Sequence, residues 1–442
     1  MGFSWSSAIA QETLLTIADH GGLGSTRVLA EDAPLPNSLD IVFAAATDDI
    51  MVFSDQGPGS TREPVERLEA SLRAHGALKN PAKDVDDSLQ ATCIGVNLVD
   101  GRFWKPPGVR LWGLIRALLH LSCRRVASPG SVAAYLGVAQ WFDLLRRLRL
   151  SVFFDVYFFC AGAKATDWIP CSLPSTVMLE LLVDATLGCF GCIDMRRPYL
   201  PLLGATDAST VFGHGAAVTP MTVDQLRTVS RLCCKAGDHV TLADGPLLPE
   251  PLSSRLGPRH VLNVPLGAFQ VVISVRVESP QHINLEEANA LLRYVRWILR
   301  SAGRFGRRIV VLLDSRVVIG AVAKGRSGSL PLNRLLRRLA ALTFAGGLIL
   351  HLVFIPTSHN PSDWPSRGGP KTWPTALRRH GVRSGRHGSA APWRPLAERI
   401  AELARTTPEH PIFASLGRSR GGNSRGYESG DEDGLTSDSN VS

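Results

Sequence analysis

No run of apolar residues in this sequence is long enough to cross a membrane. The two most apolar stretches, Ser151–Ala163 and Thr343–Pro356, are shorter than the ~18 residues of a helical span and contain Asp155 and His351. The first residues also lack a basic segment followed by an apolar one, which is the pattern of a signal peptide. We therefore expect an intracellular protein, in the nucleus or the cytoplasm, with no membrane partner.

Cysteine is scarce and scattered. The chain has eight cysteines, and only Cys189 and Cys192 form a C-x-x-C pair. No second pair follows at the spacing of a zinc ribbon, so the pattern does not predict a structural zinc site. Reduced thiols in an intracellular protein are the interpretation we adopt.

Acidic residues are outnumbered, because 39 Asp and Glu stand against 48 Lys and Arg and leave a net charge of +9. This balance favours a polyanionic partner such as nucleic acid, and an anionic membrane surface would also satisfy it. The 442 residues predict two or three domains, and a hydrophobic content of 45% is enough for sizeable cores.

Four parts differ in their residue pattern, and together they predict a chain of α/β and α+β character. Residues 1–100 show mixed α and β patterns, and residues 101–195 are mostly helical. Residues 196–370 alternate strands and helices, with 215–265 expected to form an extended insertion without clear order. Residues 371–442 turn basic, then rich in Gly, Ser and Arg, then acidic, and this composition predicts a largely disordered tail.

Apolar periodicity locates the main elements. It predicts helices over Ala8–Ala18, Pro64–His75, Val109–Ser122, Ser131–Arg149, Thr176–Thr186, Leu285–Ser301 and Leu332–Phe344. It predicts strands over Asp40–Ala46, Ile50–Ser54, Leu202–Thr206, Phe269–Val277, Arg308–Leu313 and Leu348–Ile355.

A first carboxylate pair, Asp48 and Asp49, lies between the two strands of an expected hairpin. Two like charges ~4 Å apart repel by roughly 4 kcal/mol at an effective dielectric near 20, so water or a bound cation must solvate them. A solvated turn is one reading, because Asp is a common turn residue. A divalent metal site facing a nucleotide phosphate is the other.

The flanking residues favour the metal reading, because "LDIVFAAATDDIMVFSD" resembles the palm hairpin of reverse transcriptases. "MGFSWSSAIAQ" is similar to the motif that precedes this hairpin, and "HGALKNPAKDVDDSLQATCIGVNLVDG" to the stretch that follows it. The resemblance implies a polymerase remnant in which Asp48 and Asp49 bind metal and Lys83 lies near the incoming triphosphate.

Two departures from that family remove the polymerase chemistry. Ala46 stands where the family has an aromatic residue. The sequence also begins inside the second palm motif, so the fingers and the first palm strand, with a third metal-binding Asp, are missing. Because that carboxylate is needed to hold both ions, we expect residues 1–100 to be a truncated palm without polymerase activity.

A second set of acids follows predicted strands or opens a predicted helix. Asp207 and Asp314 end strands, Glu286 and Glu287 fall in the first turn of a helix, and Asp363 comes just after a strand. Since parallel strands end at one edge of a sheet, these acids can converge. Converging carboxylates raise one another's pKa, and two Mg²⁺ ions would offset the charge. The alternative is that each acid separately caps a helix or faces its dipole.

The order of these segments resembles the ribonuclease H domain of retroelements. The resemblance is carried by "INLEEA", "LLDSR" and "NPSDWPSR". It implies a mixed-sheet domain in which Asp207, Glu287, Asp314 and Asp363 hold two Mg²⁺ ions, which Mn²⁺ could replace. The implied reaction is hydrolysis of the RNA strand of an RNA–DNA hybrid, with Glu286 as the solvated neighbour of Glu287.

Basic side chains near this site are candidates for nucleic-acid binding. The set consists of Lys324, Arg326, Arg334, Arg337 and Arg338. Helical spacing puts the last three on one face, which suits phosphate contacts as well as an ordinary solvated surface. "WFDLLRRLRL" predicts a second basic patch at Arg146, Arg147 and Arg149, beside a Trp141 expected in the core.

The full pattern resembles reverse transcriptase and ribonuclease H polyproteins of DIRS-like retroelements, and residues 101–195 then correspond to the thumb and connection. Our leading interpretation is a fragment with a degenerate polymerase and a ribonuclease H-type nuclease that acts on RNA–DNA hybrids. Two alternatives remain open, a non-catalytic remnant that binds nucleic acid and a DNA-cutting nuclease like a transposase or integrase. No residue pattern indicates an oligomeric state.

Overall fold

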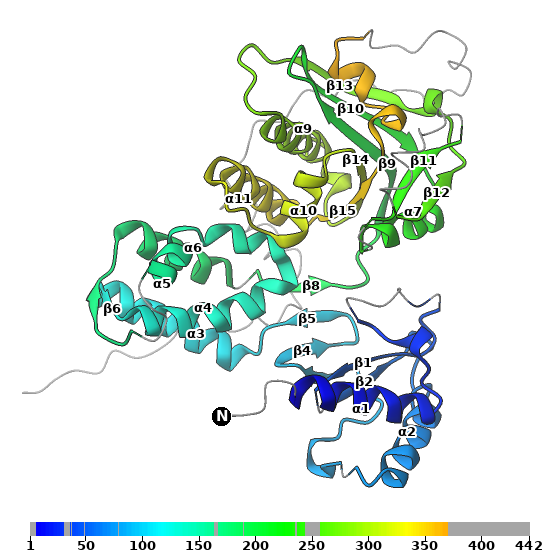
Figure 1. Cartoon of the computed structure of the whole chain (residues 1–442), viewed down its shortest axis with the longest axis vertical. Helices are drawn as coiled ribbons and strands as arrows, with labels where there is room; N and C mark the ends of the chain where they lie inside the picture. Colours follow the sequence, from blue (N-terminus) through cyan, green and yellow to red (C-terminus); the bar gives the residue numbers. More distant parts are fainter. Residues whose placement is uncertain are drawn as a thin grey trace, which may run out of the picture. The chain divides into compact units, whose positions relative to one another are not determined.

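A five-stranded mixed sheet organises the later part of the chain (Figure 1). Its strands are β9 (Tyr199–Ala208), β10 (Gly213–Pro220), β13 (Gln270–Arg276), β14 (Arg308–Leu313) and β15 (Ile349–Phe354), in the order β13-β10-β9-β14-β15. The first three are antiparallel, whereas β14 and β15 run parallel to β9. The expected mixed sheet is confirmed, and β9, β14 and β15 end at one edge of it.

The computed structural model describes residues 6–30, 36, 38–47, 49–77, 79–162, 167–188, 190–234, 237–243 and 257–369. All of them belong to one compact unit, Met1–Arg379. The expected disordered tail, residues 371–442, lies outside this described part.

Helices cover both faces of the sheet, as Figure 1 shows. On one face lie α9 (Ile283–Ile298), α10 (Arg316–Lys324) and α11 (Leu330–Ala345). Leu291, Val295 and Ile298 recur at helical spacing in α9 and are buried against β14 residues such as Val311. On the other face lie α7 (Val223–Ser230) and the parallel pair β11 (His239–Leu242) and β12 (Arg259–Leu262).

The expectation of an unordered insertion at 215–265 is wrong over much of its length. β10 is a strand inside the sheet, paired on both sides, and α7, β11 and β12 follow it. The sequence of β10, "GHGAAVTP", has few residues of high strand propensity, which hid it. The small residues have a packing reason, because a Cβ at Gly215 would lie 2.5 Å from backbone atoms of Ser362 and Ser366. Those residues belong to the segment with α12 (Asp363–Ser366), which therefore packs directly on β10.

The helical segment between residues 108 and 188 has its own core. It contains α3 (Gly108–Arg124), α4 (Pro129–Asp143), α5 (Asp155–Gly162) and α6 (Ser175–Gly188), with a short pair of strands, β6 (Val126–Ala127) and β7 (Cys171–Ser172). The predicted helices at Val109–Ser122 and Thr176–Thr186 are confirmed. The helix predicted to Arg149 ends at Asp143 and continues as a 3₁₀ segment, Leu144–Val152, inside which Arg146 leaves helical geometry at φ −139° and ψ 68°.

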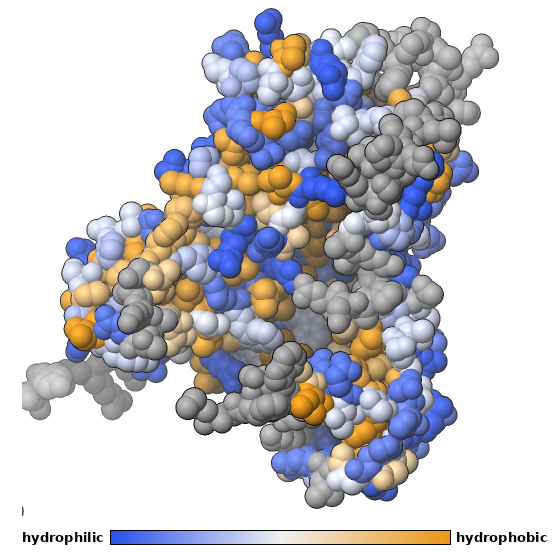
Figure 2. Space-filling model, viewed as in Figure 1, coloured by the Kyte–Doolittle hydropathy of each residue, from blue (hydrophilic) through white to orange (hydrophobic). Residues whose placement is uncertain are grey.

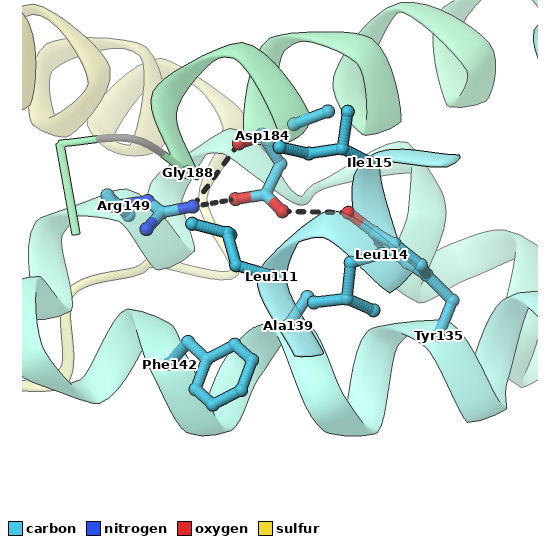
Figure 3. A pocket seen from close by; sticks show the side chains of 10 residues that line it. Leu111, Leu114, Ile115, Tyr135, Ala139, Phe142, Arg149, Asp184 and Gly188 are labelled. Atoms are coloured by element: carbon cyan, nitrogen blue, oxygen red, sulfur yellow. Dashed lines mark hydrogen bonds and ion pairs between the residues drawn. The ribbon is translucent and has the colours of Figure 1, made fainter. Parts of the chain in front are cut away.

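A buried ion network holds this segment together (Figure 3). Arg149 is 3% exposed and donates to Asp184 at 2.7 Å, while Tyr135 donates to the same carboxylate at 3.0 Å. Arg149 also pairs with the buried Asp143 at 2.9 Å. Arg146 is directed inward too, and burial lowers its pKa to about 10. The predicted basic patch is therefore wrong for these two arginines, which stabilise the fold.

The N-terminal part combines helices and small sheets. It contains α1 (Ser6–His20), α2 (Arg62–Ala74) and the antiparallel hairpin β1 (Val42–Ala46) and β2 (Asp49–Phe53). The hairpin and both helices are confirmed. A separate four-stranded sheet has the order β3 (Ala91–Cys93), β4 (Val96–Val99), β5 (Phe103–Lys105) and β8 (Ile193–Asp194), so residues near 193 close a sheet begun near 91.

Several surface features bear on the expectations from sequence. Figure 2 shows apolar patches among polar ones on the visible face, and Phe158 and Leu179 of the helical segment are more than half exposed. Within the described part of the chain, no disulfide joins Cys93, Cys123, Cys160, Cys171, Cys192 and Cys233. Among the described helices, none has the length and apolar character of a membrane span.

The contact of α12 with β10 leads to a stability prediction. Gly215→Ala should lower the free energy of unfolding by about 1–3 kcal/mol, because the new methyl group has no room. Gly320→Ala is the matched control, since a Cβ there meets nothing within 4 Å and alanine favours the α10 helix by about 1 kcal/mol. Denaturant midpoints of both variants test this, and equal midpoints would contradict it.

Candidate metal centre

Three carboxylates meet at the edge where the parallel strands end. Asp207 is the penultimate residue of β9, Asp314 directly follows β14, and Glu287 lies in the second turn of α9. One oxygen from each of the three lies within 4.8 Å of the others. Asp207 is 3% and Glu287 6% exposed, and Asp314 is half-buried. The convergence predicted from the strand ends is therefore present for these three acids.

Burial makes the charged forms of these acids unfavourable. It raises the pKa of Asp207 to about 7, with a further contribution from Asp314, and the pKa of Glu287 to about 9, with further contributions from Asp207 and Asp314. Burial also raises the pKa of Asp314. Each raised value reflects lost hydration and the negative charge of the neighbours.

Polar neighbours act on all three acids. The hydroxyl of Ser366 donates a hydrogen bond to Asp207. The backbone N–H of Ala208 lowers the pKa of Glu287 against the larger effect of burial, and the side chains of Thr357 and Asn360 do the same for Asp314.

The loop that ends at α12 is itself tied to the sheet. Asn360 donates to the carbonyl of Thr206 on β9 at 3.0 Å and accepts from the N–H of Ser362 at 3.0 Å. Ser274 of β13 donates to the carbonyl of Pro365 at 2.9 Å. Sequence reasoning assigned no role to Asn360 or Ser366, although both lie inside "NPSDWPSR", the stretch that carried the resemblance.

Asp363 lies beside the three acids but outside the cluster. Its charge contributes to the raised pKa of Asp207 and Asp314, so it is close enough to act on both. Its carboxylate accepts hydrogen bonds from Arg367, four residues later, at 2.8–3.0 Å. The structure thus brings together three of the four predicted ligands and places the fourth next to them in an ion pair.

The prediction that Glu286 is solvated is wrong. Glu286 is 3% exposed and accepts from Nε2 of His214 at 2.7 Å and from the N–H of Gln281 at 2.7 Å. Burial lowers the pKa of His214 in spite of this carboxylate, so the imidazole is neutral near pH 7 and donates from Nε2. Since His214 lies on β10, the contact joins the first turn of α9 to the sheet. Glu286 directly precedes Glu287, so the contact also helps to place Glu287.

The residues at this centre fit a divalent cation. Oε2 of Glu287 and Oδ1 of Asp314 are buried and have no hydrogen-bond partner among the described residues. Buried oxygens of this kind normally have a partner, so each has a lone pair available to a ligand. Carboxylate oxygens are the donors that Mg²⁺ and Mn²⁺ prefer. Asp207, Glu287 and Asp314 are therefore the residues that would hold the metal.

The other predicted site residues give a mixed result. Asp49 opens β2 and is exposed, whereas Asp48 and the side chain of Lys83 lie outside the described part of the chain. Lys324, Arg326, Arg334 and Arg338 are exposed, as phosphate contacts require. Arg337 is not available, because it donates to the carbonyls of Ser151 and Val152 and pairs with Glu180.

The raised pKa values predict how stability depends on pH. In the unfolded chain these acids titrate near ~4, so their raised folded values favour the native state at low pH. With metal removed by EDTA, the free energy of unfolding should fall as the pH rises from the unfolded value of ~4 and level off above the folded values of about 7 for Asp207 and about 9 for Glu287. Glu287→Gln cannot ionise, so it should come closest to the wild type at pH ~3 and exceed it by a growing margin up to pH ~9. Urea midpoints across this range test the prediction, and a pH-independent difference would contradict it.

The contact of Glu286 with His214 predicts that shortening the Glu286 side chain destabilises the protein. Glu286→Ala leaves the buried Nε2–H of His214 without its acceptor and should lower the free energy of unfolding by about 1–3 kcal/mol. Glu278→Ala, at an exposed position in the loop before α9, is the control and should leave it nearly unchanged. Equal thermal midpoints of the two variants would show that the contact between Glu286 and His214 contributes nothing to the free energy of unfolding.

Comparison with known proteins yields a likeness in structure without a likeness in sequence. No protein-family model and no curated protein matches the chain. Among solved structures, the chain is similar to the foamy viral protease-reverse transcriptase dRH in complex with ds DNA, with a TM-score of 0.31 and 9% sequence identity. The match covers 78% of this chain and 48% of that chain, so this chain spans about half the length of that protein. This likeness is too distant to assign a function.

Proposed function

We propose that the chain is a retroelement-derived fragment with a metal-dependent nuclease of the ribonuclease H type. The observation that carries the proposal is the cluster of Asp207, Glu287 and Asp314, whose carboxylate oxygens lie within 4.8 Å of one another at the edge where parallel strands end. Oxygens of two of them are buried without a hydrogen-bond partner in the described part. A set of acids that repel one another needs a cation to ionise together.

In this proposal the acids bind the metal ion, and the surrounding residues orient the acids. Asp207, Glu287 and Asp314 hold Mg²⁺, and Asp363 completes the set when its pair with Arg367 opens. Bound Mg²⁺ would supply an activated water and stabilise the leaving 3′ oxygen in hydrolysis of a phosphodiester. Ser366 orients Asp207 through the hydrogen bond that it donates, and Thr357 and Asn360 are the polar neighbours of Asp314.

We assign the RNA strand of an RNA–DNA hybrid as the substrate, on the resemblance of "INLEEA", "LLDSR" and "NPSDWPSR". In the same proposal, residues 1–100 correspond to part of a polymerase palm, 101–195 to a thumb and connection, and 196–370 to the nuclease. The exposed Lys324, Arg334 and Arg338 suit contact with phosphates near the centre.

Cleavage of a labelled RNA–DNA hybrid tests the proposal. The wild type should cut the RNA strand with Mg²⁺ and not with EDTA. Asp314→Asn should lower the rate more than about 100-fold, because losing a direct ligand should exceed the 10–100-fold cost of losing an outer-shell partner. Asp224→Asn is the control, since Asp224 is exposed on α7, on the other face of the sheet.

Two outcomes would contradict the proposal. Binding of the hybrid without cleavage would favour a non-catalytic remnant. Cleavage of duplex DNA with the hybrid left intact would favour a DNA-cutting nuclease.

A further inference from the structure

A groove of about 310 Å³ lies where the helical segment meets the loop between α10 and α11. The side chains that form its walls include Gln140, Trp141, Leu144, Tyr157 and Arg326. Its volume is at the lower end of the ~300–1,000 Å³ typical of ligand sites. No carboxylate is among its lining residues, although the chain as a whole carries 39 acids.

Hydrogen bonds to their polar groups hold two aromatic side chains of this groove in place. Trp141 is 42% exposed, which corrects the expectation that it lies in the core. Its indole N–H donates to the carbonyl of Ile94 at 2.9 Å, and Gln140 donates to the hydroxyl of Tyr157 at 2.6 Å. Because these polar groups already have partners, Trp141 and Tyr157 offer the groove their rings.

Arg326 adds a positive charge to the aromatic walls. Its guanidinium lies 4.4 Å from the centroid of the Tyr157 ring, and no described carboxylate is within ion-pair distance of it. Aromatic rings beside an unpaired arginine are the chemistry that binds an unstacked nucleobase and its phosphate. An acidic ligand without a ring would pair with Arg326 but would not stack on the aromatic rings, and a strongly cationic ligand would be repelled by Arg326.

The walls are fixed before any ligand binds. A Cβ at Gly325 would lie 1.8 Å from the carbonyl oxygen of Arg147, so the loop that carries Arg326 touches the 3₁₀ segment directly. From α11, Asn333 and Arg337 both donate to the carbonyl of Ser151, at 2.8 and 2.7 Å. A preorganised groove loses less free energy on ordering when a ligand binds.

We propose that this groove binds one unpaired nucleotide of a single-stranded nucleic acid, with its base on Trp141 and its phosphate at Arg326. The inference goes beyond the proposed nuclease, because it uses none of the carboxylates of the metal centre. Binding in the groove therefore requires no metal.

Fluorescence anisotropy with labelled oligo(dT) and oligo(rU), in EDTA so that no cleavage occurs, tests the groove. Trp141→Leu and Arg326→Gln should each raise the Kd about tenfold or more, the range expected for loss of one stacked base. Trp168→Leu and Arg227→Gln are the matched controls, since Trp168 is 64% exposed outside the groove and Arg227 is exposed on α7. Both controls should keep the wild-type Kd.

An oligonucleotide of abasic sites provides a test that needs no variant. The wild type should bind it at least about tenfold more weakly than oligo(dT), because the backbone alone cannot stack. Equal affinity for the two, absence of binding to either oligo(dT) or oligo(rU), or equal Kd values for Trp141→Leu and Trp168→Leu would overturn the inference. Binding that depends on Trp141 in a protein that fails to cleave the hybrid would leave the groove in place and remove only the nuclease.

Discussion

Three carboxylates crowded together at one edge of the five-stranded sheet are the constraint on which this part of the fold depends. Asp207, Glu287 and Asp314 cannot all ionise at neutral pH without a counter-charge, because burial and their neighbours raise each pKa. Neighbouring donors offset part of this effect, because the hydroxyl of Ser366 lowers the pKa of Asp207 and the N–H of Ala208 lowers that of Glu287. Oxygens of Glu287 and Asp314 have no hydrogen-bond partner among the residues that the structure describes, so the three acids could hold a cation. The close packing of α12 on Gly215 follows from the same need, since Ser366 must reach Asp207.

The sequence predicts an element well when the element's own residues determine it, and poorly when residues far away in the chain determine it. β14 was predicted with its bounds, because a run of Ile, Val and Leu flanked by arginine and aspartate can only be a buried strand here. Asp207, Glu287 and Asp314 were found because each stands at the end of a strongly patterned element. β10 was missed, because its small residues are required by α12, which comes about 150 residues later in the chain. The burial of Glu286 was missed for the same reason, since its partner His214 lies on that strand.

The sequence does not tell which arginines are exposed and which pair with groups inside the protein. Arg334, Arg337 and Arg338 share one helical face by spacing, but Arg337 is bound to Ser151, Val152 and Glu180 of the helical segment. Arg146 and Arg149 are likewise directed inward. Periodicity gives the face of a helix and does not tell which tertiary partner covers it. The acids Asp143, Asp184 and Glu180 are buried with these arginines, so the net charge of +9 does not tell which arginines remain at the surface for a polyanion.

One short helix joins the metal centre to the groove. α10 begins after Ser315, directly beyond Asp314, and ends at Lys324, two residues before Arg326. Gly325 terminates it with a φ of +72° and packs against Arg147, which fixes the direction of the loop. A helix of nine residues is roughly 14 Å long, about the length of four stacked nucleotides. Because a helix is stiff over this length, the spacing between the carboxylates and the groove is set by the sequence of α10, and a strand that reaches both sites must cross that interval.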